Sequence, residues 1–112
     1  MIVIRPGRDG DPAHWRLISR TTIGADVIAT APIGPAGPAG EAWRLAVERL
    51  RDGAGKLQVL PVAGGHFEWA LTGPGGEIIA QSPAPYRDAE GCRQAYATAR
   101  RAARTVLGAG LP

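Results

Sequence analysis

The chain has 112 residues, a mass of 11.7 kDa, 45% hydrophobic and 21% charged residues, and a net charge of +3. This composition is typical of one globular domain and excludes a disordered chain, and no apolar run reaches the roughly 20 residues that a membrane-spanning helix needs. The net charge is too small to indicate a particular partner, and 12 of the 13 basic residues are arginine, which a GC-rich bacterial genome would explain together with 16 glycines and 10 prolines.

The first ten residues, MIVIRPGRDG, lack the basic and apolar regions of a secretory signal peptide. The single cysteine, Cys92, cannot form an internal disulfide, which fits a reducing compartment. We therefore expect a cytoplasmic protein that does not associate with a membrane.

Three short strands are predicted in the first half of the chain. Ile2–Pro6 reads IVIRP, and His14–Ser19 reads HWRLIS, with Trp15 and Leu17 on one face of an alternating pattern. Asp26–Pro32 reads DVIATAP and is short and apolar at its centre. Each segment is bounded by glycine, proline or polar residues, as strands in small domains usually are.

A loop and a helix are predicted next. Gly34–Gly40 has a collagen-like spacing of glycine and proline but is far too short for a triple helix, so we expect a loop. Gly53 suits the left-handed residue that ends many helices. Between them, four apolar residues follow the i, i+3, i+4, i+7 spacing of a helix with one buried face: Trp43, Ala46, Val47 and Leu50.

The second half repeats the pattern of the first. Its three strand candidates match those above at offsets of 55, 52 and 51 positions: Leu57–Pro61, His66–Leu71 and Glu77–Pro83. The run from Thr72 to Gly76 contains three glycines and predicts a hairpin turn. A helix then begins at Asp88, a good N-cap, and ends near Gly108. Its buried face is predicted to contain Cys92, Tyr96, Ala99, Ala103 and Val106.

These elements predict an α+β fold built as a single domain, 1–112, from two tandem βββα repeats, 1–53 and 56–108. One helix covers three strands poorly, so the repeats are expected to complete one antiparallel sheet about a pseudo-two-fold axis, with both helices on one face. If the second strands lie side by side, Arg16 and Glu68 should pair within about 6 Å.

The stretch HFEWALTGPGGEIIAQSPAPYRDAEGCRQAYATARRA, residues 66–102, resembles the repeat of the YegP-like family of small tandem-repeat domains of unknown function. The resemblance rests on an aromatic-rich strand, a Gly-Glu turn at Gly76-Glu77, an apolar strand ending in Ser82 and a tyrosine, Tyr86, before the helix. The first repeat matches more loosely and lacks the tyrosine. The family implies two βββα repeats and provides no catalytic residue to carry over.

Candidate chemical groups have plain structural explanations. His14 and His66 could form a symmetry-related pair, but no other metal ligand lies at zinc-like spacing. Cys92 lies near a helix N-terminus, as a nucleophile would, yet on a face predicted to be buried. Gly53–Lys56 lacks the upstream glycine and the following Ser or Thr of a phosphate-binding loop. We expect no enzyme activity, no metal and no cofactor.

The strongest functional pattern is a row of arginines on the last helix. Arg93, Arg100 and Arg104 are spaced i, i+7 and i+11, and Arg101 flanks them. Such a row could hold phosphates and would then bind nucleic acid weakly and without sequence preference. A solvated helix end that complements the helix dipole explains the same residues.

Two functions therefore remain open. The first is a non-enzymatic binding module that acts through a protein partner or self-association, because an open sheet leaves faces and edges available. The alternative is nucleic-acid binding through the last helix.

Overall fold

The computed structural model describes residues 1–5, 13–21, 24–32 and 39–108. The elements in chain order are β1 (Ile2–Arg5), β2 (His14–Thr21), β3 (Gly24–Pro32), α1 (Ala39–Asp52), β4 (Lys56–Val62), a short 3₁₀ turn (Ala63–Gly65), β5 (His66–Thr72), β6 (Ile78–Gln81) and α2 (Ala89–Gly108). The order strand-strand-strand-helix thus occurs twice. Residues 34–38 of the predicted loop lie outside the described residues.

The six strands form one antiparallel sheet in the order β1-β2-β3-β6-β5-β4. The third strand of each half meets the other at the centre, where Thr30 pairs with Gln81, and β1 and β4 form the two edges. The strand arrangement that would pair Arg16 with Glu68 is therefore wrong, because β3 and β6 separate β2 from β5.

The strand pairing places the two tryptophans in a register that differs from the one read from the sequence. Trp15 lies opposite Ala31 of β3, and the carbonyl of Trp69 accepts the N–H of Ser82 just after β6. The two tryptophans therefore occupy the same place in their halves, 69 − 15 = 54 positions apart, whereas the phrases HWRLIS and HFEWAL align at 52. A shift of two residues keeps every side chain on its face, so the alternation alone cannot detect it.

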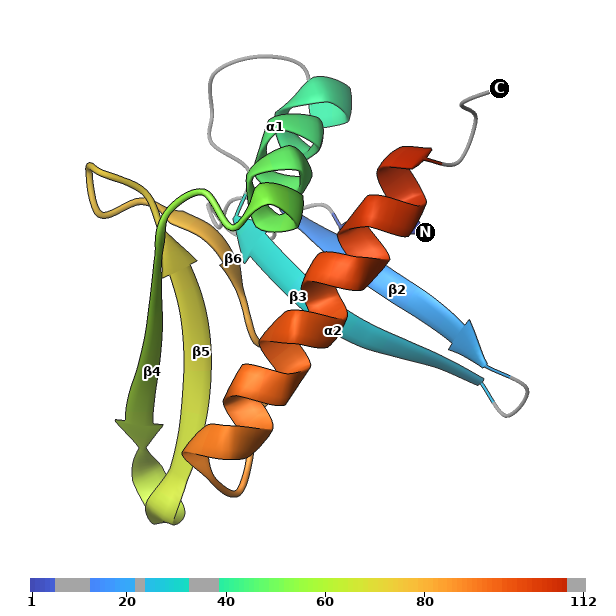
Figure 1. Cartoon of the computed structure of the whole chain (residues 1–112). Helices are drawn as coiled ribbons and strands as arrows, with labels where there is room; N and C mark the ends of the chain where they lie inside the picture. Colours follow the sequence, from blue (N-terminus) through green and yellow to red (C-terminus); the bar gives the residue numbers. More distant parts are fainter. Residues whose placement is uncertain (6–12, 22–23, 33–38, 109–112) are drawn as a thin grey trace.

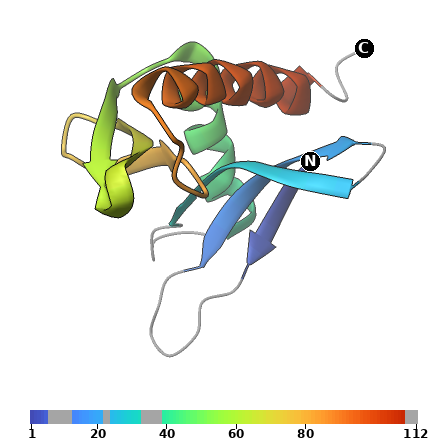
Figure 2. The same ribbon diagram turned by 90° about the horizontal axis from the view of Figure 1, so that it is seen from below.

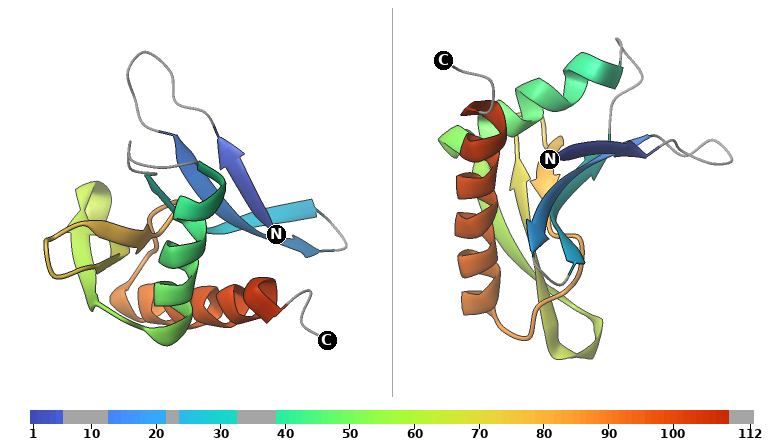
Figure 3. Two further views of the ribbon diagram at one scale, coloured as in Figure 1. Left: turned by 90° about the horizontal axis from the view of Figure 1, so that it is seen from above. Right: turned by 90° about the vertical axis from the view of Figure 1, so that its right-hand side faces the viewer.

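Both helices pack on one face of the sheet, and they cross each other there (Figures 1 and 3). Seen from below, α2 lies above the strands, which curve beneath it (Figure 2). α2 contacts β2, β3, β4 and β5, and α1 contacts β6 and α2. The core between these layers is made of buried side chains from both halves: Trp15, Leu17, Ala29, Ala31, Val47, Leu50, Trp69, Leu71, Ile79, Ala80, Cys92, Ala99 and Ala103.

The predicted helix ends are confirmed at Asp88 and Gly53. The Asp88 carboxylate accepts the N–H of Gly91 at 2.6 Å, which caps the start of α2. Gly53 has φ of 65°, and the N–H groups of Gly53 and Ala54 donate to the carbonyls of Leu50 and Arg49, as in a Schellman motif. The segment Gly53 to Lys56 therefore follows the end of a helix instead of preceding the start of one, so it is not a phosphate-binding loop.

Candidate functional site

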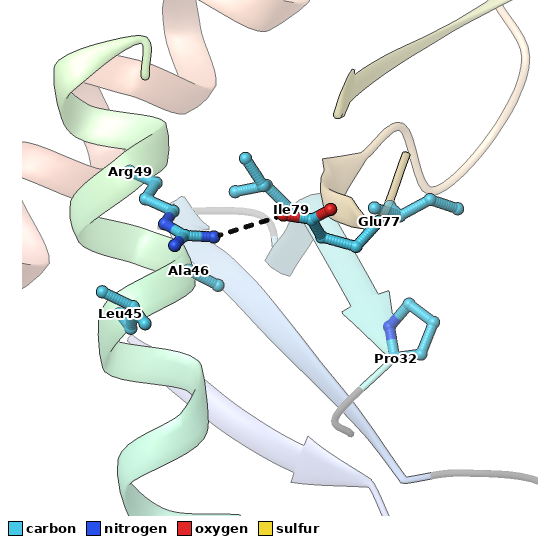
Figure 4. Close-up of a pocket in the computed structure, with 7 residues that line it drawn as sticks. Pro32, Leu45, Ala46, Arg49, Glu77 and Ile79 are labelled. Atoms are coloured by element: carbon cyan, nitrogen blue, oxygen red, sulfur yellow. Dashed lines mark ion pairs between the residues drawn. The ribbon is translucent and has the colours of Figure 1, made fainter. Parts of the chain in front are cut away.

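A groove of about 450 Å³ lies between α1 and the sheet (Figure 4). We call it the α1–β6 groove and define it by the residues that line it: Pro32, Leu45, Ala46, Arg49, Glu77, Ile78 and Ile79. α1 supplies one wall, β6 and the residue before it supply the other, and the end of β3 completes it. Its position follows from the meeting of β3 and β6 at the centre of the sheet.

The groove is apolar inside and leaves two large hydrophobic side chains exposed. Leu45 is 55% exposed and Ile78 is 40% exposed, whereas Ile79, in the wall formed by β6, is 3% exposed. Within the described residues, four large hydrophobic side chains are exposed, and two of them lie in this groove: Met1, Leu45, Leu60 and Ile78. Clustered exposed apolar residues are more informative than scattered ones, because they mark interaction surfaces.

An ion pair connects the two walls of the groove (Figure 4). Nη1 of Arg49 on α1 lies 3.7 Å from Oε1 of Glu77, which precedes β6. Both side chains are more than a third exposed, so the pair adds little to stability. Its position places one positive and one negative charge beside an apolar surface (Figure 4).

Glu77 is held in place by the β5–β6 turn. Its Oε2 accepts the N–H of Gly75 at 2.9 Å, and its carbonyl accepts the N–H of Gly73. The carboxylate lies directly over Gly73, where a Cβ atom would collide with it. The glycines predicted only to allow a turn therefore also let a charged residue fold back toward α1.

Sequence reasoning missed the groove, although one signal was present. Leu45 is apolar but falls outside the helical stripe of Trp43, Ala46, Val47 and Leu50. An apolar residue on the solvent side of an amphipathic helix indicates a surface that contacts something else.

Arg100, one of the four predicted phosphate-binding arginines, has a structural role. Its Nε and Nη2 donate to the carbonyl of Arg51 in the last turn of α1, at 3.3 and 3.2 Å. Its guanidinium also lies 5.9 Å from the centre of the Tyr96 ring and packs against Gly53. The side chain thus fastens α2 to the end of α1 and is partly buried.

The other three arginines are exposed on α2, and we call them the arginine face: Arg93, Arg101 and Arg104. Arg93 lies 3.8 Å from Glu90, and Arg101 donates to the hydroxyl of Thr98 at 3.2 Å. The acidic neighbour of Arg93 reduces the positive potential that would attract phosphates. Nucleic-acid binding by these residues remains a prediction.

The two histidines do not share a site. His14 begins β2 and His66 begins β5, with β3 and β6 between these strands. In residues 1–5, 13–21, 24–32 and 39–108, no group of three or more His, Cys, Asp or Glu side chains could hold a metal ion.

Cys92 is fully buried in the core, which removes the accessibility that a nucleophile needs. Burial raises the pKa of its thiol, and the Asp88 carboxylate raises it further. The thiol is therefore neutral at physiological pH, and the side chain acts as a small apolar core residue.

These features define the class of protein: a two-layer α+β domain with an open, six-stranded antiparallel sheet and both helices on one face. The solution NMR structure of yegP from E. coli, a protein of unknown function, is similar to this chain with a TM-score of 0.67. The two are 16% identical, and the match covers 89% of this chain and 82% of that one. The chain therefore has a YegP-like fold.

No protein-family model and no curated protein matches the sequence. No helix among the described residues is both long and apolar enough to cross a membrane.

Proposed function

We propose that this protein is a non-enzymatic, cytoplasmic binding module whose α1–β6 groove accepts an apolar segment of a partner protein. The observation that carries the proposal is the exposure of Leu45 and Ile78 in one groove above a buried Ile79. Covering these side chains removes apolar surface from water, which is the main driving force of protein association.

The polar rim of the groove supports a protein partner. Arg49 and Glu77 offer both a donor group and an acceptor group beside the apolar floor, which resembles the polar rim and apolar centre of protein interfaces. A partner segment with an apolar anchor and a polar neighbour on each side would satisfy both.

We further propose that residues 1–53 and 56–108 are two copies of one βββα unit related by a pseudo-two-fold axis. Two observations support this: both halves have the same order of elements, and in both the third, second and first strands follow one another from the centre of the sheet to its edge. So do the two register shifts, which lie between Leu17 and Ile18 of β2 and between Leu71 and Thr72 of β5, 54 positions apart like the two tryptophans.

The groove can be tested by affinity capture from the cells that produce the protein. Leu45→Glu should abolish capture of the partner, whereas Ala97→Glu, the same kind of change at an exposed position of α2, should leave it intact. Circular dichroism would verify that both variants are folded. If capture is lost with Ala97→Glu but kept with Leu45→Glu, the groove is not the site and α2 is.

A further inference from the structure

We propose that the protein self-associates through the free edge of β4, which pairs antiparallel with β4 of a second copy in one particular register. β4 forms the left-hand edge of the sheet in Figure 1 and is seven residues long, whereas β1 at the other edge has four. Long free edges are the surfaces that pair with other chains.

The backbone groups on this edge follow from the bonds of β5. Both backbone groups of Phe67 bond to Tyr86, and the carbonyl of Trp69 bonds to Ser82, so these residues direct their backbone groups away from β4. Their partners on β4, Pro61 and Val59, must then direct theirs outward. By the same alternation, Leu57 also points its N–H and carbonyl outward.

Pro61 selects the register. It has no N–H, so a partner carbonyl placed against it would lack a donor. Pairing Leu57 with Val59 of the second copy places Pro61 opposite Gly55, before the start of the partner strand, and keeps more hydrogen bonds between strand residues than pairing Leu57 with Leu57. The two-fold axis then passes beside Gln58. Each copy donates the N–H groups of Leu57 and Val59 and accepts two in return, which gives four hydrogen bonds.

The same register explains three side chains on the face that the helices leave uncovered. It places Lys56 opposite Leu60 of the second copy, and Leu60 pairs within its own sheet with Glu68. The apolar stem of Lys56 would cover Leu60, which is 46% exposed, and its ammonium group would reach Glu68 of the second copy. Neither Lys56 nor Glu68 forms an ion pair with any residue that the structure describes.

Lys56 and Glu68 of one chain cannot make this contact themselves. Glu68 pairs with Leu60, which lies four residues from Lys56 along β4, a separation of about 13 Å. The arrangement is thus complementary only between two copies, and the two-fold axis makes the contact twice.

Exchanging the charges of Lys56 and Glu68 tests the proposal. The measurement is the molar mass of each variant by light scattering over a series of protein concentrations. The wild-type mass should rise from 11.7 kDa toward twice that value. Lys56→Glu and Glu68→Lys should each raise the dissociation constant roughly tenfold, and the double variant should restore it. A wild-type protein that stays monomeric at about 1 mM, or a double variant no better than the single ones, would overturn the proposal.

Cross-linking tests the register independently. Gln58→Cys would place two thiols at the axis with Cα atoms about 4.5 Å apart, which is within the range of a disulfide. Leu60→Cys, on the same face, would place them more than about 13 Å apart. Oxidation should therefore give a covalent dimer with Gln58→Cys only, because Cys92 is buried. Equal cross-linking of both variants would rule out this register.

Discussion

Arg100 is a residue whose role depends on tertiary structure. Its position in the helical repeat groups it with the exposed arginines, but the guanidinium turns toward α1 and donates to the carbonyl of Arg51. The last carbonyls of a helix have no partners within the helix, so a cation placed there satisfies them and complements the helix dipole. Arg100 therefore belongs to the fold and not to the arginine face.

Replacement of Arg100 should destabilise the protein. Arg100→Ala removes two hydrogen bonds from a charged group and its contact with the Tyr96 ring, and we expect a loss of about 1–3 kcal/mol in the free energy of unfolding. Urea denaturation measures it. Arg104→Ala, an exposed change on the same helix, should cost less than about 0.5 kcal/mol. Equal effects of the two changes would contradict the capping role.

Burial of Cys92 predicts how the protein responds to thiol reagents. Because the thiol is covered and its pKa is raised by burial, a reagent such as Ellman's should not react with the native protein at neutral pH and should react fully in denaturant. Absorbance of the released thiolate measures the reaction. Modification of the native protein within minutes would show that the thiol is accessible.

The raised pKa of Cys92 also gives a pH dependence. The folded state keeps the thiol proton at pH values where the unfolded state loses it. The contribution of Cys92 to the free energy of unfolding is therefore constant below the ordinary thiol pKa of about 8.5 and falls above it. Denaturation midpoints compared between pH 7 and pH 10 should show the fall, and Cys92→Ala should reduce it. If Cys92→Ala leaves the fall in stability between pH 7 and pH 10 unchanged, the fall comes from other groups, such as Tyr86, whose pKa is also raised by burial.

At the scale of elements, α2 presents two different faces. One is buried on the sheet at Cys92, Ala99 and Ala103, and the other carries the arginine face. The proposed function uses α1 instead, so the two surfaces can be tested separately.

The nucleic-acid hypothesis predicts binding that falls steeply as salt rises, because bound cations release counterions from phosphates. A variant with Arg93, Arg101 and Arg104 changed to Gln should then lose affinity for a fluorescent single-stranded oligonucleotide and show a shallower salt dependence. Leu45→Glu serves as the control outside this face. No binding by the wild-type protein at low salt would exclude this function.

Element boundaries were largely predictable, because local chemistry determines them. Asp88 and Gly53 mark helix ends through bonds made within a few residues, and both predictions are confirmed. The alternation of apolar and polar residues around Trp15 and Trp69 likewise predicted the strands β2 and β5 and which face of each is buried in the core. The α1–β6 groove was not predicted, because it depends on which strands meet at the centre, and the short apolar third strands do not specify a neighbour.

At the scale of the whole molecule, the two halves share one core. α2 from the second half contacts β2 and β3 of the first, and Arg100 caps the helix of the first half. The order of the strands in the sheet could not be predicted, because edge strands and central strands of this chain have similar patterns of apolar residues. Only the antiparallel class of the sheet was predictable.

Neither half should fold alone. Peptides 1–53 and 56–108 should each show the circular dichroism of an unfolded chain, because each leaves apolar strand faces without cover. The intact protein at the same concentration provides the reference spectrum. A cooperative thermal transition in either peptide would show that the halves are independent.

The position of α2 after all six strands has a consequence for synthesis. This helix covers β2, β3, β4 and β5, so both tryptophans of the sheet remain open to solvent until its residues have left the ribosome. A nascent chain that ends before α2 thus exposes the apolar face of the sheet. Partly folded chains with such exposed apolar surface aggregate or recruit chaperones. Native closure of this domain is therefore expected only when α2, its last helix, docks on the sheet.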